Sequence, residues 1–296
     1  MIYCPYTDRE ITEEDATPEH IIPLALGGSN RFTIRVDSAA NAKIGTEIDG
    51  RLAKDFLISQ RRRDSAVKGH SRKLPEVVLK KTVMLPANRQ VQLTLRGREK
   101  PTVWDSREQR VLSEEETAGQ EFHSTITIPI FSRLQFVAKV ALAAGFYIYG
   151  SEFRSNVLHS EVRPFLTASP NDCRDIVGSS KVRFYDQFMP PFEVDNQLWV
   201  AIDALCRSTN GSRILLMPGS SNLGISVGIL GQHIGTINIP ASTDSFPLGG
   251  SHDLGHVVNI TSRVVERLSF REACKRLLDE LPHDGEPSDS LGNSSG

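Results

Sequence analysis

The sequence predicts an α+β protein, because strand-like and helix-like segments are mixed along the chain without a repeating period. The chain has 296 residues, of which 39% are hydrophobic and 24% are charged, so it can bury a sizeable core. A long amphipathic apolar segment at residues 131–149 predicts a central helix, and several short alternating segments predict strands. These observations predict the fold class and leave the function open.

The first 60 residues predict a strand, a loop, a second strand and a helix. The strand-like segments are residues 19–23 and 32–36, and a Gly-Gly-Ser-Asn turn lies between them. Asp37 or Ser38 can cap the helix, whose apolar residues recur at intervals of four through about residue 57. We therefore expect one helix face to be buried.

The rest of the chain predicts a longer mixed region. The expected elements are a strand pair at residues 77–84 and 90–95, a strand at 123–130, the helix at 131–149 ending at Gly150, strands at 181–185, 213–217, 224–230 and 234–239, and a helix at 262–281. We expect four parts: residues 1–60, a basic connecting segment at 61–100 with the strand pair, an α+β domain of unknown role at 101–281, and a disordered tail at 282–296.

Targeting signals and disulfides are not expected. Lys139 interrupts the longest apolar run, so no membrane span is predicted, and the first residues lack the basic and apolar regions of a signal peptide. The four cysteines are widely separated, which indicates reduced thiols. We therefore expect a cytoplasmic protein that does not bind membranes.

Positive charge is concentrated in one fifth of the chain. The formal net charge is −2, yet residues 51–100 carry fourteen basic side chains and four acidic ones. A local basic excess favours contact with a phosphate backbone, and a plain solvated surface is the alternative. The candidate nucleic-acid-binding residues are Arg61, Arg62, Arg63, Arg72, Lys73, Lys80 and Lys81.

One motif near the N-terminus is more specific than these patterns. Glu19 directly precedes His20, Ile-Ile-Pro follows, Asn30 comes ten residues after the histidine behind Gly-Gly-Ser, and Asn41 lies at the expected helix start. This set resembles the HNH endonucleases, which are ββα-metal nucleases, over about the first 60 residues. The resemblance implies an N-terminal ββα-metal (HNH) module followed by a mixed α+β domain, and hydrolysis of phosphodiester bonds in DNA.

The resemblance also implies roles for these residues. His20 corresponds to the general base and Asn30 to the asparagine that orients it, while Glu19 and Asn41 correspond to ligands of the catalytic metal. A carboxylate and an amide oxygen suit Mg²⁺ or Mn²⁺, which stabilise charge that develops on the phosphate. Because neighbouring strand residues point to opposite faces, Glu19 and His20 can serve one site only if the strand is kinked there or one side chain reaches it at an angle.

The chain departs from the family in its cysteines. Many HNH proteins stabilise the small hairpin of this module with a zinc ion bound by two Cys-x-x-Cys pairs. Of those four cysteine positions, only Cys4 is a cysteine here. No structural zinc is therefore expected, and Cys4 is interpreted as a buried thiol. The carboxylates Glu47 and Asp49 are expected to be exposed on the helix.

Three functional interpretations follow from the sequence. The first is a metal-dependent DNA endonuclease. The second is a catalytically inactive nucleic-acid-binding module derived from the HNH fold, and the third is a nuclease that cleaves RNA. The expected partner is DNA, with RNA as the alternative, and a protein partner or a homodimer is left open.

Overall fold

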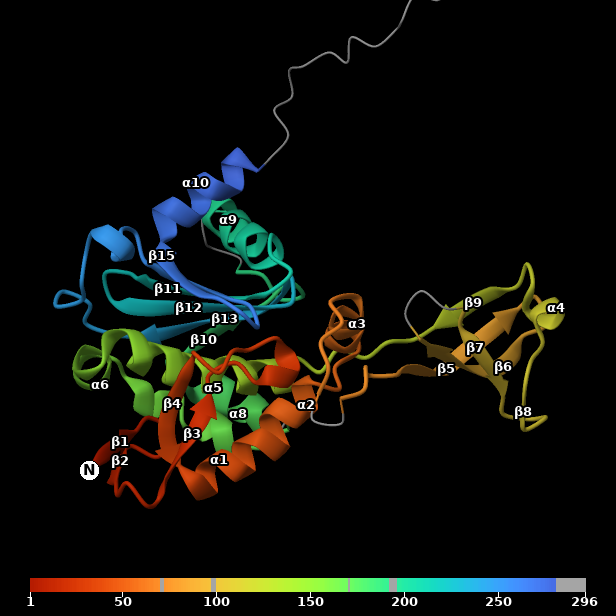
Figure 1. Cartoon of the computed structure of the whole chain (residues 1–296), viewed down its shortest axis with the longest axis horizontal. Helices are drawn as coiled ribbons and strands as arrows, with labels where there is room; N and C mark the ends of the chain where they lie inside the picture. Colours follow the sequence, from red (N-terminus) through yellow and green to blue (C-terminus); the bar gives the residue numbers. More distant parts are fainter. Residues whose placement is uncertain (70–71, 97–99, 170, 192–195, 281–296) are drawn as a thin grey trace, which may run out of the picture.

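The computed structural model describes residues 1–69, 72–96, 100–169, 171–191 and 196–280, so the tail expected at 282–296 lies outside the described residues. The fold is α+β, as expected. An N-terminal unit packs beside a sheet domain, and a sheet arm projects away from both (Figure 1). The N-terminal unit and the sheet domain share one hydrophobic core.

The N-terminal unit contains two hairpins and a segmented helix. Its elements are β1 (Ile2–Cys4), β2 (Arg9–Ile11), β3 (Ala16–His20), β4 (Thr33–Asp37), α1 (Ser38–Ile44), a π-helical turn (Gly45–Asp49), α2 (Gly50–Leu52) and α3 (Phe56–Asp64). The predicted order of strand, loop, strand and helix is confirmed. The helix ends earlier than expected, because Asp55 accepts a hydrogen bond from the Ile58 amide and caps a new helix.

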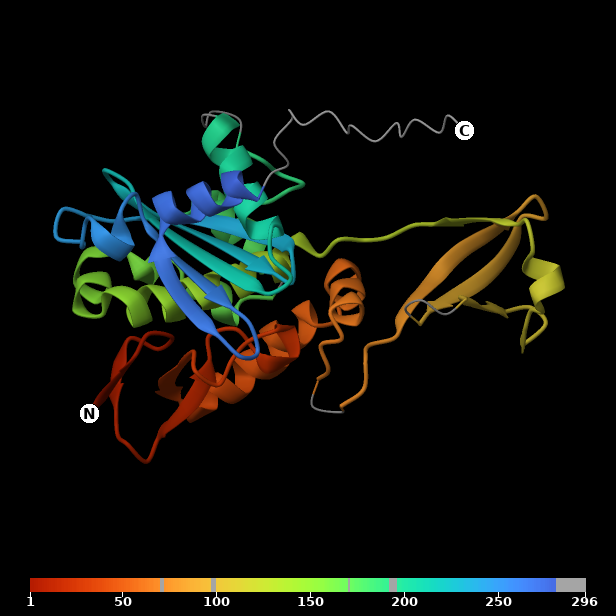
Figure 2. The ribbon, with the colours of Figure 1, turned by 45° about the horizontal axis from the view of Figure 1, so that its top comes forward.

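The arm is a five-stranded antiparallel sheet with a small core of its own (Figure 2). Its elements are β5 (Val77–Leu85), β6 (Arg89–Leu95), β7 (Thr102–Asp105), β8 (Arg110–Val111), α4 (Glu114–Thr117) and β9 (Glu121–Ser124), in the strand order β8-β7-β6-β5-β9. The predicted strand pair is confirmed as β5 and β6. The boundary expected after residue 100 is wrong, because β7 on its far side pairs with β6.

The sheet domain has a six-stranded antiparallel sheet between helices (Figure 1). Its elements are α5 (Ile130–Tyr149), α6 (Ser151–Asn156), α7 (Pro164–Thr167), α8 (Asp172–Ser179), β10 (Arg183–Tyr185), α9 (Asn196–Arg207), β11 (Ser212–Pro218), β12 (Asn222–Ile229), β13 (Gln232–Pro240), β14 (His256–Ile260), β15 (Val265–Ser269) and α10 (Phe270–Asp279). The strand order is β10-β13-β12-β11-β14-β15. Helix α5 packs on one face, and α9 and α10 pack on the other.

Two predicted elements differ from the structure. The helix expected at residues 262–281 is a strand followed by a helix, because residues 265–269 pair with β14 before Ser269 caps α10. Its last expected residue lies outside the described residues. Of the strand expected at 123–130, only the first two residues lie in a strand, β9. The last expected residue, Ile130, already belongs to α5.

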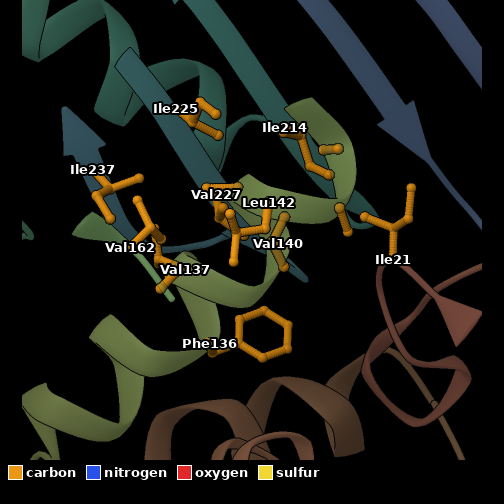
Figure 3. Close-up of a cluster of buried hydrophobic side chains, with 14 of the residues drawn as sticks. Ile21, Phe136, Val137, Val140, Leu142, Val162, Ile214, Ile225, Val227 and Ile237 are labelled. Carbon is orange, nitrogen blue, oxygen red and sulfur yellow. The ribbon is translucent and has the colours of Figure 1, made fainter. Parts of the chain in front are cut away.

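Helix α5 is the central element of the shared core. Its length and composition match those of a membrane-crossing helix, but 78% of its most apolar window is buried inside the protein, as in a core helix. Figure 3 shows Val140 and Leu142 of α5 packed toward β12, with Ile21 of the N-terminal unit beside the same cluster. The loop that follows β3 therefore packs against α5.

Candidate active site

The strand that carries the candidate base belongs to a two-stranded antiparallel hairpin. In this hairpin β3 ends at His20, which lies opposite Thr33 of β4. The connecting loop is tight, and a Cβ on Gly28 would lie 1.7 Å from the Ile22 carbonyl oxygen, so only glycine fits there. This loop returns Asn30 to the end of β3.

His20 and Asn30 are in direct contact. His20 Nε2 lies 2.8 Å from Asn30 Oδ1, and because a carboxamide oxygen only accepts hydrogen bonds, Nε2 is the donor. The neutral ring then keeps its lone pair on Nδ1, where it can accept a proton. His20 is half-buried and Asn30 is exposed, so this pair lies at the protein surface.

Asn41 lies in α1 and packs back on β3. Helix α1 begins where the Asp37 side chain accepts a hydrogen bond from the Ala40 amide at 2.8 Å. Asn41 Nδ2 then donates to the Pro18 carbonyl oxygen at 3.4 Å. The helix thus brings Asn41 to the strand that ends at His20.

Glu19 points into the protein, where it meets a buried lysine of α5. Glu19 is 7% exposed, and its Oε1 lies 2.5 Å from Lys139 Nζ in an ion pair that lacks hydrogen-bond geometry. Lys139 is fully buried, and its ammonium also donates to the carbonyl oxygens of His20 and Ile21, at 2.9 and 3.2 Å. Glu19 is therefore held on the core side of the strand.

Asp49 shares this buried cluster, so the expectation that it is exposed is wrong. Its Oδ2 lies 3.4 Å from Lys139 Nζ, and the side chain is buried. Burial raises the pKa of Asp49 to about 6, with nearby Glu19 adding to the rise and Lys139 opposing it. Burial also raises the pKa of Tyr6 well above its usual range, and the same two carboxylates add to that rise.

This arrangement does not fit the divalent cation that the resemblance implies. The carboxylate of Glu19 already faces the Lys139 ammonium, and a second cation beside it would be repelled. Within the described ranges, no group of three or more His, Cys, Asp or Glu side chains could hold a metal ion. The roles of Glu19 and Asn41 as metal ligands stay predictions.

Several contacts join the hairpin of β1 and β2 to the rest of the protein. Cys4 is buried, as expected, and its Sγ accepts a hydrogen bond from the Asp37 amide at 3.3 Å. Arg163, after α6, donates to the Pro5 carbonyl oxygen and to the Tyr3 hydroxyl, both at 3.0 Å. The Arg163 bonds attach this hairpin to the sheet domain.

The basic candidates divide into exposed and structural residues. The exposed ones are Arg61, Arg72, Lys73, Lys80 and Lys81. Arg63 is half-buried and donates to the Pro75 carbonyl oxygen at 2.7 Å. Arg62 is buried and donates to the Ala53 carbonyl oxygen at 3.1 Å, and burial lowers its pKa. The expectation that Arg62 faces phosphates is therefore wrong, since its guanidinium stabilises the end of the helical segment.

Two of the exposed lysines line a cavity where the arm meets the body. This cavity has a volume of about 510 Å³, and its basic lining residues are Arg51, Lys54, Lys80 and Lys81. The one carboxylate in the lining, Asp55, is fully buried and paired with Arg133. The cavity therefore presents positive charge.

No protein-family model matches the chain, and no curated protein or solved structure matches it. Sequence reasoning missed the role of Lys139 and the burial of Asp49, although a lone lysine inside the apolar stretch 136–149 was a usable signal.

We expect the raised pKa of Asp49 to make stability depend on pH. A carboxyl group whose folded pKa of about 6 exceeds its unfolded value of 3.8 binds protons more tightly when folded, so stability falls as pH rises through that window. Between pH 4.5 and 7, wild type should lose about 2 kcal/mol of unfolding free energy relative to Asp49→Asn. Urea unfolding measures this difference, with Glu47→Gln as control; a difference that does not vary with pH contradicts it.

We expect the N-terminal hairpin to need no structural zinc. Elemental analysis of protein purified without added metal should find far less than one zinc per chain, and EDTA should leave the melting temperature unchanged. Tightly held stoichiometric zinc contradicts this expectation. Cys4 would then be tested first, together with His70, which lies outside the described residues.

Proposed function

We propose that the chain is an HNH-type endonuclease that hydrolyses phosphodiester bonds of DNA, with His20 as general base. The observation that carries the proposal is the 2.8 Å contact between His20 Nε2 and Asn30 Oδ1 at the protein surface. Support also comes from α1, which packs Asn41 against the same strand. The residues that carry the resemblance therefore include a histidine whose Nε2 is hydrogen-bonded to Asn30.

In the proposed reaction, His20 Nδ1 takes a proton from a water molecule. The water oxygen attacks phosphorus, the bond to the leaving oxygen breaks, and that oxygen takes up a proton from solvent, while the proton on His20 is later released to solvent. Asn30 holds the ring in the tautomer that has its lone pair on Nδ1. The resemblance implies dependence on Mg²⁺ or Mn²⁺, but the pairing of Glu19 with Lys139 does not fit that ion, so the proposed reaction assigns no step to a metal.

The proposed interface with nucleic acid is the basic cavity between arm and body together with the nearby exposed cations. Lys80 and Lys81 share the cavity with Arg51 and Lys54, and Arg61 is exposed on α3. Such side chains bind phosphates without reading sequence. Many arm cations are instead paired with carboxylates, as Arg110 is with Glu116, and belong less to this interface.

A second candidate is a catalytically inactive module that binds nucleic acid. The pair between Glu19 and Lys139 favours it, because that pair withdraws the carboxylate expected to bind the catalytic metal. Both candidates bind nucleic acid, but only the first cleaves it. Cleavage of RNA instead of DNA is a variant of the first candidate, and assays with matched DNA and RNA substrates distinguish the two.

We expect purified wild type to nick supercoiled plasmid, and His20→Ala to lower the rate by about 100-fold or more, because a general base typically contributes that much. His159→Ala is the control, since this histidine is also half-buried but lies outside the hairpin. Reactions with Mg²⁺, with Mn²⁺ and with EDTA test the metal, and a matched RNA tests the substrate.

Two outcomes contradict the nuclease proposal. One is a folded wild-type protein that cleaves neither DNA nor RNA with any of these additions. The other is cleavage that survives His20→Ala undiminished, which would identify a contaminant or another site. Binding without cleavage would support the inactive module.

We expect nucleic-acid binding to depend steeply on salt through Lys80 and Lys81. The double variant Lys80→Gln/Lys81→Gln should reduce the magnitude of the slope of log affinity against log salt concentration by about 2. Each lost phosphate contact contributes about 0.9 to this slope. Removing two exposed charges elsewhere, in Arg263→Gln/Lys275→Gln, should leave the slope unchanged. Equal slopes for all three proteins, measured by fluorescence anisotropy, would support a plain solvated surface.

A further inference from the structure

Lys139 is a charged side chain in the middle of a core helix. It lies in α5, between apolar residues of that helix that pack against the six-stranded sheet, and it is fully buried. Burying an ammonium is costly unless oxygen atoms surround it. Its partners therefore indicate what the lysine is there to hold.

The partners of Lys139 cluster where β3 ends. Its Nζ contacts Glu19 Oε1 at 2.5 Å and donates to the carbonyl oxygens of His20 and Ile21, at 2.9 and 3.2 Å. Three consecutive residues of the hairpin thus bind one ammonium that comes from another part of the fold. Asp49 Oδ2, from the helical segment after α1, completes the set at 3.4 Å.

We propose that Lys139 is a positioning residue for His20. This proposal rests on the function proposed above. His20 is held at two points, through its ring by Asn30 and through its carbonyl oxygen by Lys139. The ring contact fixes the tautomer, and the backbone contact fixes where the strand stops and in which direction Cβ points. Without Lys139, the strand end is released and the carboxylates of Glu19 and Asp49 are left buried beside one another.

The same helix offers a matched control. Arg133 and Asp55 are both fully buried and form two hydrogen bonds of 3.1 Å between α5 and the start of α3. This pair also joins α5 to the N-terminal unit, but it contacts neither His20 nor the β3 strand end. Breaking it should lower stability without moving the histidine.

The experiment compares two variants in which a positive and a negative charge are removed together, Lys139→Met/Asp49→Asn and Arg133→Met/Asp55→Asn. Urea unfolding measures the stability of each. Nitrogen NMR of the histidine ring reports the tautomer of His20, whose signals are assigned by their loss in His20→Gln. Plasmid nicking gives kcat and KM.

We expect both double variants to lose stability, and only the Lys139 variant to change the site. Its His20 ring signals should move from the pure Nε2-protonated tautomer toward a mixture. Its kcat should fall by about 10- to 100-fold with KM unchanged, because small displacements of a catalytic group have effects of this size. Where the Lys139 double variant does not fold, Lys139→Gln is measured in the same way.

Unchanged His20 signals in the folded Lys139 variants would overturn the proposal, and so would the same change in the Arg133 variant. The NMR measurement does not need cleavage activity. A wild-type protein that cleaves nothing would therefore contradict the proposed nuclease function, while the ring signals would still decide whether Lys139 positions His20.

Discussion

An ammonium group that is removed from water must be surrounded by oxygen atoms, and Lys139 meets this requirement with atoms of the candidate site. Its ligands are two carboxylates and two consecutive backbone carbonyls, which come from sequence positions about 90 to 120 residues earlier. The conformation of the β3 strand end and the burial of Glu19 and Asp49 follow from this one contact. The end of the β3 strand is therefore built against α5.

Buried ion pairs join the N-terminal unit to the sheet domain. Besides Lys139, α5 contributes Arg133, which is fully buried against Asp55 at the start of α3. Ile21 and Ile22 complete the attachment by entering the core around α5. The sheet domain thus packs directly on the N-terminal unit and shares its core. The arm, with its own small core, is joined to this body by two chain segments and carries the basic cavity at its base.

Local patterns predicted much of this protein, and long-range contacts account for what they missed. Spacing of apolar residues identified α5 and most strands, and the resemblance to HNH endonucleases implied that Asn30 orients His20, with which it is in contact. The burial of Asp49 and Arg62 could not be read from their neighbours in sequence, because it depends on which distant segments cover them. The last expected helix failed for a similar reason, since pairing with β14 decides that residues 265–269 form a strand.

A crystal structure of an inactive His20 variant bound to a DNA duplex tests the central claim most directly. The account predicts a phosphate within one water molecule of the position of His20 Nδ1, with Lys80 and Lys81 against neighbouring phosphates of the same duplex. Lys139 should remain in contact with the strand end beneath. A duplex bound away from the hairpin, with residue 20 facing open solvent, would contradict the assignment of this surface as the hydrolytic site.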